Sequence, residues 1–490
     1  MSRLRRLRRW WPVIPIVALA LLVYAALPGR WTYTVSPETT YVTGPLDAQG
    51  YVDYPTALNE RLGKGVDPDN NANVLIWKAL GPRPEGGNGM PPEYFRWLGI
   101  DPPPEQGEYF LGSDEYFQAH LAGKAGAAPA GTGEDDPPGP KKQWDDRLAR
   151  ARSWPWQAAD EPDIADWLRR NERPLAVLIE ASKRPRYFHP RVSKLTSVGE
   201  PRLLSSLLPT LKKCRAAGLA LVCRGMSREA AGDDDGAWQD LLACQRLGRV
   251  IAAGGGSLVE GFVGMELIDA ASAAELALLG RGRHSSQRVL GWLADSRALP
   301  PLVPLADVLE PGERFLMLDM LTNVASFGGQ NLDPARGFVR ATPRGSGFWD
   351  TLFTRNIDWD PALRRANAVF DRCVAAARQP DRRIAGQEFA QVGGEVELAR
   401  LVAEGMSPLE KFMLGKGEVG EAIGIRVIAL ALPAIDKVRD AWDRTEQTQR
   451  NLQVAFALAA YRADAGRYPA RLAELAPKYL PEVPGDLFSG

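Results

Sequence analysis

Helix signals follow one another almost without interruption from residue 144 to residue 415, and this pattern constrains the fold more than any other feature of the sequence. Apolar residues recur at three- and four-residue intervals over 201–226, the spacing of an amphipathic helix, and we expect Pro209 to kink that helix without ending it. The run Gly-Asp-Asp-Asp-Gly at 232–236 indicates a turn, after which 237–252 returns as a second helix. The sequence therefore predicts a mainly α fold, an array of antiparallel helices joined by short turns.

The third long helix of this array carries its own start signal. Ser257 and Glu260 have the spacing of a capping box, in which each residue accepts a backbone N–H of the other, so we expect a helix to about Leu279. Further helices are expected at 163–170, 174–183, 285–293, 312–327, 360–378 and 407–414. We find no fixed-period repeat, so the array does not match a tetratricopeptide-type solenoid.

Residues 30–122 form a small aromatic-rich region for which short helices are expected. Three Glu-Tyr-Phe triplets, at Glu93, Glu108 and Glu115, favour a small aromatic core, and an aromatic platform for carbohydrate or peptide is the alternative. Residues 123–143 are low in sequence complexity and predict a flexible linker to the array at 144–415.

The first 29 residues carry a membrane signal. Five arginines lie between residues 3 and 9, and an apolar run, Val13 to Leu27, follows Trp10 and Trp11. This asymmetry of positive charge retains the N-terminus in the cytoplasm and places the body outside it. A single-pass anchor in the cell inner membrane, through residues 10–27, is the favoured interpretation. The alternative is a signal peptide cleaved after Val23-Tyr24-Ala25, which would release the body as a secreted or periplasmic protein.

The overall composition excludes several classes of function. Lys+Arg and Asp+Glu are 60 each, so no global field attracts nucleic acid. His120, His189 and His284 stand far apart, and the four cysteines match no zinc pattern. No phosphate-binding loop, nucleophile elbow or His-Glu-x-x-His helix occurs, so no cofactor or metal is expected.

Three acidic residues are the candidates for catalysis. Glu266 and Asp269 lie three residues apart on an expected apolar helix, so they share a face, and burial would raise the pKa of one of them. Asp319, on a later helix, is a possible partner for an extracytoplasmic hydrolase. The favoured interpretation is structural, with an arginine paired to each acid. Carboxylates that converge in a water-accessible pocket would favour the enzyme instead.

One cysteine pair is a candidate disulfide. Cys223 and Cys244 each lie about ten residues from the centre of the turn at Asp233 and Asp234, so an antiparallel hairpin places them at the same level. An extracytoplasmic compartment permits their oxidation. Two buried thiols that merely share a hairpin are the equally weighted alternative.

The longest helical pattern of the chain covers residues 420–465, within a C-terminal segment that we place at 416–490. Apolar ends flank a charged middle from Asp436 to Arg450, and Gly466-Arg467-Tyr468-Pro469 ends the pattern. We expect one continuous helix from about Glu421 to Ala465, with apolar ends that pack on protein, because Arg426 interrupts the apolar run.

This segment resembles pilin-like proteins, in particular the major pseudopilin of type II secretion. The matching stretches are Ala429–Ala434, Thr445–Leu452, Tyr461–Pro469, Leu472–Leu475 and Pro484–Gly490. The resemblance implies a helix packed on a small sheet that follows it. The chain departs from the family because its segment is internal and lacks a cleavage glycine before an apolar N-terminal helix. It also stops where strands would follow, so we expect either a truncated sequence or a missing sheet.

The whole chain resembles uncharacterised membrane-anchored proteins of planctomycete-type bacteria, a group that implies no activity. The expected function is therefore a membrane-tethered extracytoplasmic interaction or scaffold protein with a protein partner. An extracytoplasmic hydrolase and a subunit of a secretion or pilus-like assembly are the alternatives.

Overall fold

The computed structural model describes residues 32–87, 89–123, 139–193, 202–206, 208–327, 357–406, 410 and 414–489. Over these ranges the chain is helical and forms no β-strand, and its β pairing is limited to isolated bridges such as that between Thr32 and Asp358. The predicted mainly α class is confirmed. The expected anchor at 10–27, residues 328–356 and most of the expected helix at 407–414 lie outside the described residues.

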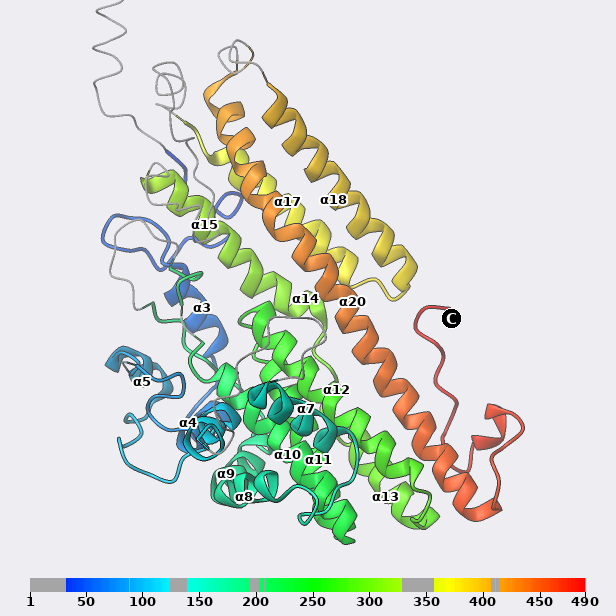
Figure 1. Ribbon diagram of the computed structural model, residues 1–490. Coiled ribbons are helices and arrows are strands. Elements are labelled where there is room, and N and C mark those ends of the chain that lie inside the picture. The colour runs from blue at the N-terminus through cyan, green and yellow to red at the C-terminus, as the bar shows by residue number, and fades with distance from the viewer. Residues whose placement is uncertain are drawn as a thin grey trace, which may run out of the picture.

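Three antiparallel helices form the centre of the molecule (Figure 1). They are α10 (Leu211–Ala231), α11 (Asp234–Ala252) and α12 (Leu258–Gly280). The side chain of Ser257 accepts the backbone N–H of Glu260 and begins α12, which is one half of the predicted capping box. The Glu260 carboxylate pairs with Arg191 instead of forming the other half. Two glycines let α11 and α12 approach closely, because a Cβ added at Gly264 would lie 2.5 Å from the carbonyl oxygen of Gly248.

The N-terminal part of the chain packs against these helices. Its helices are α3 (Tyr54–Leu62), α4 (Ala72–Leu80), α5 (Pro92–Leu98), α6 (Ser113–Tyr116) with the π-turn η1 (Phe117–Leu121), α7 (Pro140–Ser153), α8 (Pro162–Arg170) and α9 (Glu172–Ser182). The first of the three triplets forms a small aromatic cluster, in which Tyr94 and Phe95 pack with Trp77. The other two triplets do not join it: Phe110, Tyr116 and Phe117 are buried in the larger core and Tyr109 is half-buried, so the predicted aromatic core is confirmed only in part. Most of the predicted linker, 124–138, lies outside the described residues. Its last residues belong to α7, because Pro140 begins that helix at the first helical position, where a missing N–H costs nothing.

The second half of the chain is organised around α20 (Lys416–Ala465), which runs along the whole edge of the array (Figure 1). It packs in turn on α17, α18, α12 and α13. The remaining helices are α13 (Ser286–Arg297), α14 (Leu305–Val308) with the π-turn η2 (Leu309–Glu313), α15 (Arg314–Phe327), α17 (Asp360–Ala377), α18 (Arg382–Gly405) and the 3₁₀ turn η4 (Leu472–Leu475).

The long C-terminal helix is continuous, as predicted. It ends at Gly466, which adopts the left-handed conformation at φ 68° and whose N–H donates to the carbonyl of Arg462. Ile425, Ile428, Phe456 and Ala460 from its two apolar ends are buried in the protein. No helix among the described residues is long and apolar enough to cross a membrane.

The predicted helix over 201–226 is wrong in its first half. Residues 202–206 form a turn, and the helix begins only at Leu211. Pro209 lies two residues before that start, where its missing N–H breaks no helical hydrogen bond, so it precedes the helix and does not kink it. The helix then continues to Ala231, and Gly232 closes it in the left-handed region at φ 86°.

Candidate functional site

The three candidate catalytic acids do not share a site, because each carboxylate is held by a different segment. Arg215 on α10 donates two hydrogen bonds to Glu266. Asp269 accepts a 2.9 Å hydrogen bond from Thr445 Oγ1 on α20, and burial raises the pKa of its carboxyl. Of the three acids, only Glu266 forms an ion pair with an arginine among the described residues.

Asp319 is buried separately on α15. Its Oδ2 accepts the backbone N–H of Leu203 at 2.8 Å, and burial raises the pKa of the carboxyl to about 7. Among the described residues, no side chain that could act as a base or nucleophile is hydrogen-bonded to the Asp319 carboxylate. The acid-pair geometry that an extracytoplasmic hydrolase requires is thus not formed by Glu266, Asp269 and Asp319.

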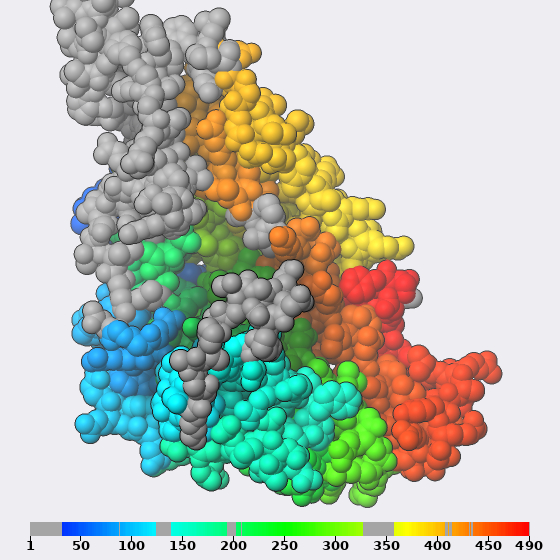
Figure 2. Space-filling view, in the orientation of Figure 1, coloured from blue at the N-terminus to red at the C-terminus, as the bar shows by residue number. Residues whose placement is uncertain are grey.

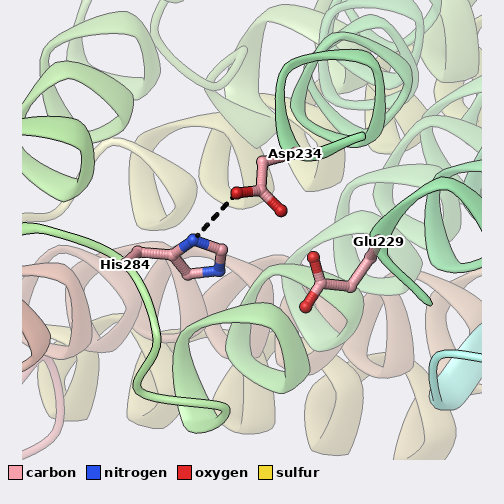
Figure 3. Close-up of side chains that lie close together, drawn as sticks. All are labelled: Glu229, Asp234 and His284. Carbon is pink, nitrogen blue, oxygen red and sulfur yellow. Dashed lines mark ion pairs between the residues drawn. The ribbon is translucent and has the colours of Figure 1, made fainter. Parts of the chain in front are cut away.

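Glu229, Asp234 and His284 come together where α10 meets α11, beside the segment that links α12 to α13 (Figure 3). One ligand atom of each lies within 4.8 Å of the others, which is compatible with a metal site. Arg283, however, donates to both carboxylates at 2.6 Å, and Arg288 donates to Asp234 at 2.6 Å. These guanidinium groups already supply the positive charge that a cation would bring, so we interpret the cluster as an ion-pair network that joins the helix ends.

A second buried cluster joins the segment that follows α9 to α12. Arg191 donates to the carboxylate of Glu260, and His189 Nδ1 lies 3.2 Å from the other carboxylate oxygen. Burial alone would raise the pKa of Glu260, but the charge of Arg191 and the hydrogen bond from His189 lower it to about 2. The Glu260 and His189 side chains are each about 1% exposed, so no substrate reaches them and the cluster is structural.

The cysteines are free thiols. Cys214, Cys223, Cys244 and Cys373 are all buried, and the candidate pair Cys223 and Cys244 forms no disulfide in the structure. The thiol of Cys244 donates instead to the carbonyl of Leu267 at 3.4 Å. Burial raises the pKa of the Cys223 thiol to about 12, so it is neutral at physiological pH. The pair therefore behaves as buried small side chains, the alternative left open by the sequence.

A cavity of about 590 Å³ opens at the middle of α20, between that helix, the start of α18 and the segment from α13 to α14. We call it the arginine cavity, because Arg249, Arg297, Arg382, Arg439 and Arg450 line it, together with Asp443, Glu446, Gln449, Gln453 and Ser296. Its apolar wall consists of Leu299, Leu302, Val303, Leu305, Ala377, Ala385 and Trp442. A concave site of this size with convergent polar groups is typical of a ligand pocket.

Arg249 is the buried cation of this cavity. Its guanidinium donates to the carbonyl oxygen of Pro300 at 2.7 Å and to Oε1 of Gln449 at 2.6 Å, and neither acceptor is charged. Burial lowers the pKa of Arg249 to about 10, although the group remains protonated at neutral pH. A buried charge without a counter-charge costs several kcal/mol, so Arg249 is poised to accept an anion.

A chain of buried hydrogen bonds connects Arg249 to the buried acid Glu275. Gln449 Nε2 donates to Ser272 Oγ at 2.7 Å, and Gln245 Nε2 donates to both Ser272 Oγ and Glu275 Oε1. Burial raises the pKa of Glu275 to about 8, so this carboxyl is mostly protonated at neutral pH and does not neutralise Arg249.

A groove of about 540 Å³ lies between the last turns of α18 and the first turns of α20, the two helices that lie side by side at the upper right of Figure 2. We call it the α18–α20 groove. It is lined by Arg365, Glu395, Leu398, Ala399, Val402, Ala403, Met406, Leu414, Glu418, Glu421, Ala422 and Ile425. Leu398, Leu401 and Val402 beside it are 64%, 51% and 55% exposed.

Comparison with known proteins returns no match among family models, curated proteins or solved structures.

Sequence reasoning missed both the arginine cavity and the groove. The cavity's arginines come from four helices, α11, α13, α18 and α20. Arg249 and Gln449, which bond to each other in the cavity, are 200 residues apart in the sequence. No local pattern brings such positions together. The exposed apolar residues on α18 do have a local signal, since Leu398, Leu401 and Val402 are spaced three and four apart on one helical face.

Proposed function

We propose that this chain is a membrane-tethered extracytoplasmic interaction protein whose α18–α20 groove binds an amphipathic helix of a partner protein. The observation that carries the proposal is the apolar face at the C-terminal end of α18. Leu398, Leu401 and Val402 expose more than half of each side chain next to the groove. Contiguous exposed apolar surface rimmed by polar residues is typical of a protein-binding site.

The shape of the groove favours a helical partner. Two helices pack closely at its base, where Arg426 of α20 donates to the carbonyl of Ala403 at the end of α18. A groove between two helices accepts the apolar face of a third helix.

The charge at the rim indicates the partner's chemistry. Glu395, Glu418 and Glu421 line the groove, against the single cation Arg365. Glu418 also accepts the N–H of Gly415 at 2.8 Å and Arg372 pairs with Glu395, so part of this charge is balanced locally. A helix with lysine or arginine beside its apolar face complements the acidic excess, whereas an anionic lipid surface would be repelled.

The proposed tether joins the body close to this groove. The N–H of Thr32 donates to Ile357 and the carbonyl of Thr32 accepts from Trp359, while Asp358 donates to the carbonyl of Lys416 at the start of α20. Five peptide steps separate Leu27, the end of the apolar run, from Thr32, which limits their separation to about 18 Å. A body anchored through residues 10–27 would therefore hold the groove near the membrane surface, where an anchored partner is accessible.

The alternatives have less support. The hydrolase lacks a shared acid site, because Glu266, Asp269 and Asp319 are bonded to different segments. A role in a secretion or pilus-like assembly rests on the resemblance of the C-terminal segment alone.

The experiment compares complex size before and after polar substitution of the groove. Full-length chain is extracted from envelope membranes in mild detergent and separated on a native gel. We expect the wild type to migrate in a larger complex and the double variant L398S/L401S to migrate as the lone chain. L472S, at an equally exposed leucine on η4, should migrate like the wild type. Unchanged migration of L398S/L401S would contradict the proposal.

A further inference from the structure

The arginine cavity has the features of a binding site for a small organic molecule, independent of the α18–α20 groove. We propose that it binds an organic oxyanion with an apolar body, whose charged group lies between Arg249 and Arg297. The oxyanion is a carboxylate or a phosphate monoester, and the apolar body contacts the wall formed by the α13–α14 segment and Trp442.

The first step of the argument is the state of Arg249. Its side chain is 8% exposed, and its two hydrogen-bond acceptors are the neutral groups of Pro300 and Gln449. A guanidinium has five N–H donors in a planar fork. The Nε of Arg249 is buried and has no hydrogen-bond partner, so the fork is not satisfied by the protein. An oxyanion in the adjacent cavity would supply the missing counter-charge.

The second step separates spare arginines from occupied ones. Arg382 pairs with Asp443 at 3.1 Å and with Glu446 at 2.9 Å, and Arg450 pairs with Glu446 at 2.8 Å. Arg439 likewise has acidic partners, the nearest of them Asp440 at 2.8 Å. All three guanidinium groups are therefore occupied: Arg382 joins α18 to α20, whereas Arg439 and Arg450 pair with acids of α20 itself.

Arg297 is the second arginine of the proposed anion-binding site. It is an exposed residue at the end of α13, it lines the same cavity, and within the described part of the chain it makes no ion pair or hydrogen bond. The cavity thus offers one buried and one rim arginine without carboxylate partners. Two such cations attract an anion more strongly than the structural ion pairs beside them, whose fields largely cancel.

The third step concerns the apolar body. Leu299 and Leu302 line the cavity from the connection before α14, and Leu305 lines it from the first residue of α14. Trp442 holds that connection by donating its indole N–H to the carbonyl of Val303 at 2.8 Å. A bare inorganic anion would leave this apolar wall in contact with water. A ligand with an aliphatic or aromatic body would bury it, and about 590 Å³ accommodates a molecule of that size.

The test uses the full-length chain in lipid nanodiscs and isothermal titration calorimetry, with empty nanodiscs as the blank. The probes are 4-phenylbutanoate, phenyl phosphate, and 4-phenylbutanamide, which is a neutral isostere of the first. We expect one of the two anions to bind at least tenfold more tightly than the amide, and the better anion identifies the headgroup. Equal binding of all three would overturn the proposal.

Substitutions locate the site and separate it from other surfaces. R249Q and R297Q should each weaken binding of the preferred anion at least tenfold, because each removes a charged donor. R215Q, which removes a half-exposed arginine paired with Glu266, is the matched control and should bind normally. R297Q changes an exposed residue, so it tests the site even if R249Q fails to fold. Normal binding by R297Q, or binding of acetate or inorganic phosphate as tight as that of the aromatic anion, would overturn the assignment. L398S/L401S should bind the anion normally, so this result is independent of the groove.

Discussion

The close approach of α11 and α12 makes Gly264→Ala a sharp test of the central packing. A Cβ at position 264 would lie 2.5 Å from the carbonyl oxygen of Gly248, 2.8 Å from the Cβ of Ala252 and 3.0 Å from the backbone nitrogen of Ala252. Two of these atoms belong to the backbone of a buried helix, which cannot yield as a flexible side chain would. We therefore expect overpacking to cost about 1–3 kcal/mol, towards the upper end of that range.

A matched glycine removes the effect of helix propensity. Alanine favours a helix interior over glycine by about 1 kcal/mol, and this gain offsets part of the overpacking cost. Gly291 in α13 is exposed and has no atom within 4 Å of an added Cβ, so Gly291→Ala gains propensity without a clash. The difference between the two variants then reports the overpacking alone.

The measurement is the melting temperature of the full-length chain in mild detergent, followed by circular dichroism. The entropy of unfolding is about 2.1 cal/mol/K per residue, so for a chain of 490 residues 1 kcal/mol corresponds to about 1 °C. We expect G291A to melt slightly above the wild type and G264A to melt about 1–3 °C below G291A. If G264A melted at or above G291A, the helices could not be packed as closely as the structure has them.

Three further predictions follow from the buried charges and thiols. Burial raises the pKa of the Glu275 carboxyl from 4.5 to about 8, so the folded state binds more protons than the unfolded state between these pH values. The stability that Glu275 contributes is complete below pH 4.5 and is lost as the pH rises through 8, so E275Q should reduce the pH slope of the unfolding free energy over this range by up to about 1.4 kcal/mol per pH unit. An unchanged slope would refute the assignment. Arg191→Met leaves Glu260 buried without its cation and should lower the unfolding free energy by about 3–5 kcal/mol in chemical denaturation. Arg215→Met removes a half-exposed ion pair and should lower the unfolding free energy by under about 1 kcal/mol. Similar losses in the two variants would contradict the difference in burial. Thiol titration without reductant should find four reactive groups after denaturation and almost none before it, because every cysteine is free and buried; two missing thiols would instead indicate a disulfide.

The parts of the fold that the sequence predicted correctly depend on local chemistry. Ser257 begins α12 and Gly466 ends α20 as expected, because a cap is decided by a few neighbouring residues. Helix α18 was not predicted, since Gly393 and Gly394 interrupt its middle and much of its surface is polar. Packing against α17 and α20 supplies the stabilisation that its propensity lacks.

Candidate residues were less predictable than helices, because pairing is a tertiary property. Glu266 and Asp269 share a helix as expected, yet they point to α10 and α20 respectively. The spacing of three residues predicted a shared face, but the two neighbouring helices divide that face between them. Cys223 and Cys244 lie at equal sequence distances from a turn, yet they form no disulfide. The Cys244 thiol instead donates to the carbonyl of Leu267 on α12.

The most direct test of the proposed function is photo-cross-linking in intact cells from the exposed apolar face of α18 beside the α18–α20 groove. A benzophenone amino acid replaces Leu401, and in a control chain it replaces the equally exposed Leu472. We expect illumination at position 401 to yield a discrete adduct with a second protein, whose cross-linked peptide, identified by mass spectrometry, is a helix with basic residues beside an apolar face. Position 472 should yield no such adduct. Adducts from position 401 that contain only lipid, a second copy of the chain, or another segment of the same chain would contradict the proposed function.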